Sequence, residues 1–303
     1  MSELLPTVPK YFDPTTDYGF KKLFGEEANK DLLMDFLNSM MPPHHQINAL
    51  AFQKTEQLPD HEEGRKTIYD ILCQDLSGET FVVEMQKAPM TYLMDRATYY
   101  TTFAIQAQAP KGPWNFKLKP VYFIGILDFE YDTKIKRWQK RKLLRTFSLR
   151  DDDGVLMTDN LHFKFLQLPF FTKEKDQLET KFDKWCYFLK NLETMDAIPA
   201  ILNEPIFEKA FDVASLSNME KMDYILYQIS KSKKYDMQIL AEEAEERGME
   251  RGMERGMERK DIQNVLKFYG KGYPTPEISD LLDIPVEKVI EILRNHGFAD
   301  LTP

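Results

Sequence analysis

YDILCQDLSGETFVVEMQK, residues 69–87, consists of two apolar runs joined by a short polar segment. The alternation of apolar and polar side chains predicts two β-strands with a tight turn between them. A three-residue loop at residues 76–78, with glycine in the third position, fixes the register of the pair. In that register Asp70 lies directly opposite Glu84. The segment therefore predicts a β-hairpin with two carboxylates facing each other across its strands.

The predicted register divides the hairpin into two faces, because side chains alternate along a strand. The face expected to join the core carries Tyr69, Ile71, Cys73, Phe81, Val83 and Met85. The other face carries the polar side chains Asp70, Gln74, Glu84 and Gln86.

Two interpretations of the polar face are open. Carboxylates on directly opposed residues have Cβ atoms about 5 Å apart and repel each other unless a cation compensates them. Oxygen ligands suit Mg²⁺ or Mn²⁺, with water completing the coordination. In the alternative interpretation, the face is the solvated side of a half-exposed sheet and its carboxylates have no function.

The segments around the hairpin predict an α/β fold. The expected order is helix 17–40 with a break near Gly25, strand 47–55, strand 67–74, strand 80–87, helix 90–107, strand 120–127 and strand 161–171. Short connections favour an antiparallel meander for the first three strands, whereas the helical crossover favours a parallel strand after it. The prediction is a mixed sheet flanked by helices.

Composition and charge restrict the class of protein. The 303 residues are 43% hydrophobic, which suffices for a sizeable core, and the formal net charge is −9. A negative total argues against non-specific coating of nucleic acid, which depends on Lys and Arg meeting phosphates. The apolar runs are shorter than the roughly 18 residues of a membrane span, and the first residues have no signal-peptide pattern. We therefore expect a cytoplasmic protein with no membrane partner.

Residues 134–150 form a basic segment with eight Lys and Arg residues and no acid. One interpretation is a strand or hairpin with a solvated basic face. The other is a rim that contacts phosphates beside an active site. In this second interpretation, the candidate DNA-binding residues of the segment are Lys136, Arg137, Lys140 and Arg141.

Helical patterns dominate from about residue 174 onward. RGMERGMERGMER, residues 247–259, has a four-residue period that aligns its glycines in one seam of a helix. Each glycine costs roughly 1 kcal/mol of helix propensity relative to alanine. The repeat is therefore either a flexible or marginally helical connector or a helix that pairs through its glycine seam in a homo-oligomer. Residues 261–303 have the outline of a helix-turn-helix, which serves as a DNA reader or as a protein-interaction bundle.

Five motifs along the chain occur in a specific order. They are TDYGFKKLFG (16–25), DLLMDFLN (31–38), the YDILCQD and VVEMQ strands of the hairpin, RATYYTTFAIQAQ (96–108) and KPVYFIGILDF (119–129). In this order they resemble the recombination-promoting nuclease or transposase family of the PD-(D/E)XK nuclease superfamily. The resemblance covers roughly residues 10–240. It implies a restriction-endonuclease-like fold with a helical C-terminal extension. It also implies a Mg²⁺-dependent DNA endonuclease linked to recombination or mobile elements.

The resemblance also implies roles for residues of the hairpin. Asp70 and Glu84 would hold Mg²⁺, or Mn²⁺ as a substitute, with the backbone carbonyl of Met85 as a further ligand. Gln86 stands where lysine is usual in the superfamily. It would orient the attacking water or contact the scissile phosphate, without the charge or proton-transfer capacity of lysine.

Three residues outside the hairpin are further candidates. Asp17 and Lys21, one helical turn apart, are expected to line the same cleft, or else to be a capping Asp and a solvated Lys. Arg96 is expected near DNA, or else as a packing arginine whose charged end reaches solvent.

The predicted organisation has four parts. They are a nuclease core (residues 1–180), a helical extension of it (181–245), an RGME-repeat connector (246–260) and a helix-turn-helix-like module (261–303). The leading functional hypothesis is a metal-dependent DNA endonuclease. The alternative is a catalytically weak or inactive nuclease fold that acts as a DNA-binding or protein-assembly module.

Overall fold

The computed structural model describes residues 9–57, 67–132 and 140–298. The chain divides into two compact units, the first ending at Gln238 and the second beginning at Ile239. Among the described residues, no helix has both the length and the apolar composition that crossing a bilayer requires.

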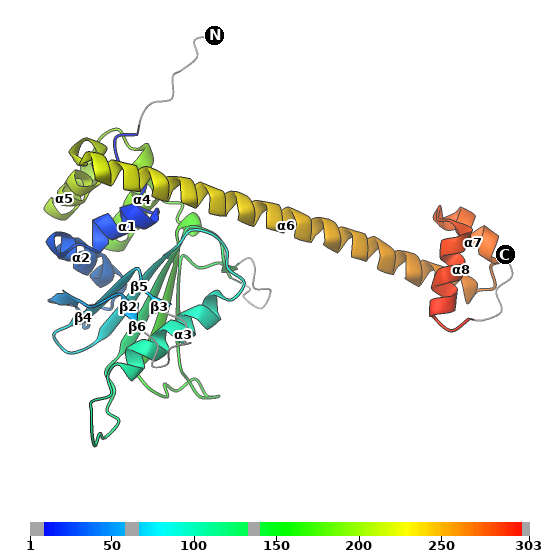
Figure 1. The fold of residues 1–303 in the computed structure, drawn as a ribbon, viewed down its shortest axis with the longest axis horizontal. Helices are drawn as coiled ribbons and strands as arrows, with labels where there is room; N and C mark the ends of the chain where they lie inside the picture. Colours follow the sequence, from blue (N-terminus) through cyan, green and yellow to red (C-terminus); the bar gives the residue numbers. More distant parts are fainter. Residues whose placement is uncertain (1–8, 58–66, 133–139, 299–303) are drawn as a thin grey trace, which may run out of the picture. The chain divides into compact units, whose positions relative to one another are not determined.

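Within the described residues, a six-stranded mixed sheet forms the centre of the first unit (Figure 1). In spatial order its strands are β1 (Leu50–Phe52), β4 (Ile71–Asp75), β5 (Thr80–Gln86), β6 (Val121–Leu127), β8 (Leu161–Gln167) and β7 (Leu144–Ser148). Strands β1, β4 and β5 are antiparallel, whereas β5, β6 and β8 are parallel. The predicted meander and the parallel strand after the helical crossover are thus confirmed. A separate pair is formed by β2 (Glu56–Gln57) and β3 (Thr67–Ile68).

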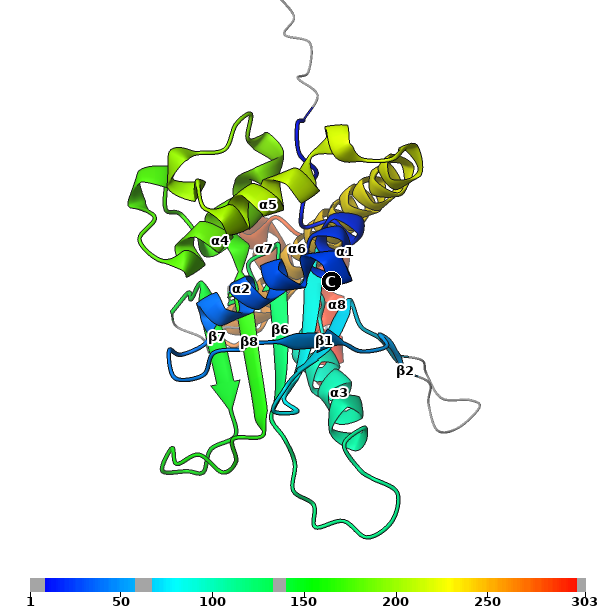
Figure 2. The ribbon, with the colours of Figure 1, turned by 90° about the vertical axis from the view of Figure 1, so that its left-hand side faces the viewer.

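Helices cover both faces of this sheet (Figure 1 and Figure 2). The α-helices of the described residues are α1 (Asp17–Phe24), α2 (Lys30–Met40), α3 (Leu93–Gln106), α4 (Lys181–Asn191), α5 (Pro205–Ala214), α6 (Lys221–Tyr269), α7 (Thr275–Leu282) and α8 (Val286–Asn295). The predicted break at Gly25 is confirmed, because α1 ends at Phe24 and the Gly25 N–H donates to the Lys21 carbonyl at 2.8 Å.

Two apolar cores lie on opposite sides of the hairpin. Phe81 and Val83 of β5 pack into the larger core, together with apolar residues of α1, α2, α4 and α5. Val82 faces the other way and packs with Leu93 and Ala97 of α3. The interpretation of this second face as a solvated surface is therefore wrong for Glu84 and Gln86, which are buried, whereas Asp70 and Gln74 are half-buried.

The register of the hairpin agrees with the prediction. Gln74 pairs with Thr80, and Gly78 has a φ of +89°, which glycine adopts without the strain that a Cβ would add. Continued by four residues, this register sets Asp70 opposite Glu84. The expected position of Tyr69 is wrong, because its side chain packs in the core under α3. Regular alternation is lost where the chain is interrupted between β3 and β4.

The second unit has a small core of its own. It contains Val265 from the end of α6, Ile278 from α7 and Val289 and Leu293 from α8. The RGME repeat lies inside α6 and is helical. At each of its glycines, no described atom lies within 4 Å of the position that a Cβ would occupy, beyond the helix itself. The glycine seam therefore faces open space.

Truncation after Tyr235 is expected to leave the first unit folded and to change its assembly state. Tyr227, Ser230 and Lys234 of α6 are buried in the first unit, and all three remain in the shortened chain. Thermal melting should give a transition close to that of the full chain, and light scattering should give a different oligomeric state. Insoluble or unfolded protein would show that the second unit is needed for the first to fold.

Candidate active site

Asp70 and Glu84 meet at the end of the hairpin through hydrogen bonds. The Asp70 N–H donates to Glu84 Oε1 at 3.1 Å, and Asp70 Oδ2 accepts from the Met85 N–H at 2.9 Å. The Gln86 side-chain amide donates to Glu84 Oε2 at 3.3 Å. The chain leaves the strand alignment at Asp70, which lets its backbone and side chain both reach β5. The structure thus brings together the hairpin residues singled out from the sequence.

Burial governs the electrostatics of this pair. The Glu84 side chain is 2% exposed, and its desolvation, together with the nearby charge of Asp70, raises the pKa of Glu84 to about 8. Desolvation also raises the pKa of Asp70, although the hydrogen bond from Met85 and the Lys21 charge oppose that rise. A buried carboxylate next to a partly buried one, whose side chain is 20% exposed, favours a bound cation.

Two basic side chains approach the carboxylates from opposite sides of the sheet. From α3, Arg96 Nη2 lies 3.6 Å from Glu84 Oε2, and its guanidinium lies 4.7 Å from the centroid of the Tyr100 ring. From α1, Lys21 Nζ lies 3.6 Å from Asp70 Oδ1. Arg96 and Lys21 therefore both belong to the surroundings of the carboxylate pair.

Asp17 joins the site through Lys21. Its Oδ1 lies 3.2 Å from Lys21 Nζ, and the Asp17 side chain is half-exposed. The alternative in which Asp17 caps its helix is wrong, because Thr16 is the N-cap and its hydroxyl accepts from the Gly19 N–H at 3.0 Å. Asp17 is the first residue of α1.

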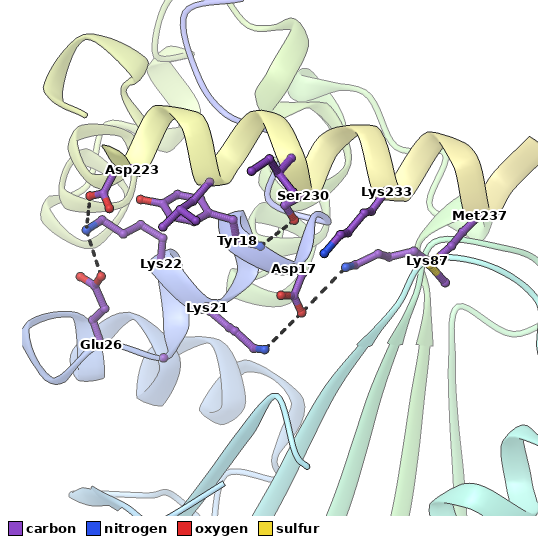
Figure 3. A pocket seen from close by; sticks show the side chains of 13 residues that line it. Asp17, Tyr18, Lys21, Lys22, Glu26, Lys87, Asp223, Ser230, Lys233 and Met237 are labelled. Carbon is purple, nitrogen blue, oxygen red and sulfur yellow. Dashed lines mark hydrogen bonds and ion pairs between the residues drawn. The ribbon is translucent and has the colours of Figure 1, made fainter. Parts of the chain in front are cut away.

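A groove of about 550 Å³ opens beside this cluster in the first unit (Figure 3). Its lining comes from α1, from the first turns of α6 and from Lys87 after β5. Lys87 Nζ lies 3.9 Å from Asp17 Oδ1, and burial lowers the pKa of Lys87. Sequence analysis missed the part of α6 in this groove, since a segment some 200 residues away carries no local signal of its neighbours.

The basic segment is only partly described. Lys136 and Arg137 lie outside the described residues. Lys140 and Arg141 are exposed ahead of β7, and neither lines the groove of Figure 3. The Arg141 guanidinium lies 5.8 Å from the centroid of the Phe170 ring.

The donor atoms at the carboxylate pair fit a hard divalent cation. Asp70 Oδ1 and Glu84 Oε2 are the oxygens that the described backbone N–H groups do not bond, and their neighbours are the side chains of Lys21, Gln86 and Arg96. Two carboxylates with water in the other positions are a suitable ligand set for Mg²⁺. No group of three or more His, Cys, Asp and Glu side chains suited to a metal occurs in the described parts of the chain. Met85 lies within the β5–β6 ladder opposite Ile126, and its carbonyl as a ligand stays a prediction.

Comparison with known proteins gives one informative match. No curated protein and no solved structure matches the chain significantly. A family model described as PD-(D/E)XK nuclease family transposase matches residues 14–244, which is well over half of the chain. The matched range contains the carboxylate pair, Asp17, Lys21, Arg96 and the whole lining of the groove. Nucleases of this superfamily generally use divalent metal ions, and membership implies DNA binding. With its restriction-endonuclease-like mixed sheet, the chain therefore belongs to the PD-(D/E)XK nuclease family of transposases.

Proposed function

We propose that the protein is a metal-dependent DNA endonuclease of the cytoplasm, linked to recombination or mobile elements. The observation that carries the proposal is the pair of the buried Glu84 and the partly buried Asp70, hydrogen-bonded across the hairpin beside a lysine-lined groove. Carboxylates placed in this way are costly unless cations compensate them, and Lys21 and Arg96, each 3.6 Å from one carboxylate oxygen, supply only part of that compensation, since the pKa of Glu84 stays raised.

In this proposal Asp70 and Glu84 hold Mg²⁺, which Mn²⁺ can replace, with the Met85 carbonyl as a further ligand. A divalent cation bound there supplies a Lewis acid for the phosphate and lowers the pKa of a bound water. The hydrogen bonds from the Met85 and Asp70 N–H groups hold both carboxylates in position before the substrate arrives.

The neighbouring polar side chains have separate tasks. Gln86 is neutral, so its amide orients the attacking water or contacts the phosphate and transfers no proton. Lys21 and Arg96 are basic side chains near the two carboxylates. They are placed to stabilise negative charge that develops on phosphate oxygens during hydrolysis.

An alternative function is a catalytically weak or inactive nuclease fold that acts as a DNA-binding or protein-assembly module. Gln86 in place of the usual lysine favours weak catalysis. The exposed methionines Met249, Met253 and Met257 beside the open glycine seam favour a homo-oligomer formed through the C-terminal helices.

Incubation with supercoiled plasmid separates the two functions. Nicking in Mg²⁺ or Mn²⁺ that disappears in EDTA supports the endonuclease. Absence of nicking at high protein concentration, with the DNA still retarded in a gel shift, supports the binding module.

The basic segment gives a separate prediction. A fourfold variant of this segment replaces with serine the residues Lys136, Arg137, Lys140 and Arg141. The variant is expected to bind DNA more weakly, with an affinity that depends less on salt concentration. Each lost phosphate contact removes about 0.9 from the slope of log affinity against log salt. Serine at Lys111 and Lys117, on the loop after α3, is the control and should leave the slope unchanged. An unchanged slope in the fourfold variant would mean that the segment is merely a solvated basic surface.

A further inference from the structure

The groove of Figure 3 has an uneven distribution of charge. At one end, Lys22 is neutralised by Glu26 at 2.9 Å and by Asp223 at 3.4 Å. At the other end, next to the carboxylate pair, Lys21, Lys87 and Lys233 surround Asp17.

Lys233 is the member of this group that comes from α6. Its side chain is exposed, and Figure 3 shows its amine directed toward Lys87 and Asp17. Three lysines share this end of the groove with Asp17, and Asp70 lies 3.6 Å from Lys21 Nζ, so two carboxylates face three basic side chains and one positive charge is left in excess. Such an excess attracts a phosphate group.

The α6 side of the groove is partly apolar: beside Asp223, Ser230 and Lys233, half of its lining side chains form an apolar wall. Leu226, Ile229 and Met237 line it with side chains that are 46–47% exposed. Lysines at one end and exposed aliphatic side chains along a wall match the two parts of a nucleotide, its phosphate and its base. The groove volume of about 550 Å³ lies within the roughly 300–1,000 Å³ of small-ligand pockets. A groove of that size suits a small ligand such as a nucleotide.

We propose that this groove binds unpaired nucleotides next to the scissile phosphate. Lys21, Lys87 and Lys233 contact the flanking phosphate, and the apolar wall of α6 contacts the bases. Bases expose their flat faces to such a wall only when they are unpaired, which selects single-stranded nucleic acid at this position. The inference rests on the proposed nuclease function, because it takes the carboxylate pair as the place of cleavage.

Binding of fluorescent DNA in EDTA tests the groove without cleavage. The probes are a blunt duplex and the same duplex with a short single-stranded tail. The wild type is expected to bind the tailed duplex several-fold more tightly. In Lys233→Gln this preference should largely disappear, and the salt slope for the tailed probe should fall by about 0.7, the value for one phosphate of a single strand. Lys221→Gln, an exposed lysine of α6 outside the groove, should behave as the wild type.

A second variant separates the apolar wall from the lysines. Leu226→Ser should reduce the preference for the tail and leave the salt slope unchanged, because no charge is removed. A wild type without tail preference, or equal losses in Lys233→Gln and Lys221→Gln, would overturn the inference.

Plasmid cleavage separates failure of this inference from failure of the proposed function. One outcome is metal-dependent cleavage by the wild type that Asp70→Asn loses, together with equal binding of both probes by the wild type. This outcome would refute only the binding of unpaired nucleotides in the groove. Absence of cleavage in the wild type, or cleavage by Asp70→Asn, would refute the proposed function whatever the groove binds.

Discussion

Asp70→Asn is expected to abolish DNA cleavage while leaving the metal-free protein as stable as the wild type or more so. The amide keeps the shape of the side chain and an oxygen that accepts from the Met85 N–H. Burial and the charge of Asp70 raise the pKa of Glu84 to about 8, so ionising both carboxylates is unfavourable in the metal-free wild type, and the substitution removes that cost. Plasmid nicking measures the first effect, and thermal melting in EDTA measures the second.

Metal binding should distinguish the two proteins further. A ligand that binds only the folded state at ten times its dissociation constant stabilises that state by roughly 1.4 kcal/mol. Mg²⁺ or Mn²⁺ should therefore raise the melting temperature of the wild type and hardly affect Asp70→Asn. Asp159→Asn is a matched control, because it makes the same change at an exposed carboxylate ahead of β8. A wild-type melting temperature indifferent to both metals, or nicking by Asp70→Asn, would remove the metal site from the proposal.

Much of the fold could be predicted from the sequence because its signals are local. Alternating side chains mark the strands, and Gly78 marks the turn that sets the register of the hairpin. A helix between two apolar strands indicates a parallel crossover, as observed for β5 and β6. The same local rules placed Tyr69 on the wrong face, because a strand interruption changes the direction of the next side chain without changing the sequence pattern.

The candidate site could be predicted only where its residues share one hairpin. The approach of Asp70 and Glu84 follows from register, but the burial of Glu84 beside Arg96 of α3 does not. Alternating apolar and polar residues are equally typical of a sheet face that is exposed to solvent. Only the presence of a helix over the face distinguishes a covered face from an exposed one. Lys233 had no signal at all, since its position depends on how α6 packs against α1.

Lys234→Ala is expected to destabilise the first unit by about 3–5 kcal/mol, the usual cost of removing one partner from a buried ion pair. Lys234 Nζ lies 2.8 Å from Asp13 Oδ2 and 2.7 Å from Asp128 Oδ2. The side chains of Lys234 and Asp13 are 11% and 8% exposed. Without the ammonium group, two carboxylates would remain close together and poorly solvated. Chemical denaturation should show the loss as a lower midpoint.

Neighbouring positions supply the controls for this effect. Lys233→Ala alters the adjacent, exposed lysine and should leave the denaturation midpoint unchanged. Adding Asp13→Asn to Lys234→Ala should recover part of the lost stability, because one uncompensated charge disappears while the volume of the side chain is kept. If the double variant is no more stable than Lys234→Ala, the stability lost in Lys234→Ala comes from lost packing of the side chain and not from uncompensated charge.

The same ion pairs connect α6 to the floor of the active site. Asp128 directly follows β6, and its N–H donates to the Gln86 carbonyl at 2.9 Å. Lys234 therefore joins the helix that supplies Lys233 to the strands that carry the carboxylate pair. Lys234→Ala should weaken binding of the tailed duplex even under conditions where the variant is folded, because the apolar wall of the groove is no longer held in place. Tight binding of that duplex by folded Lys234→Ala would mean that other contacts, such as that of Ser230 with the Tyr18 N–H, suffice to position α6.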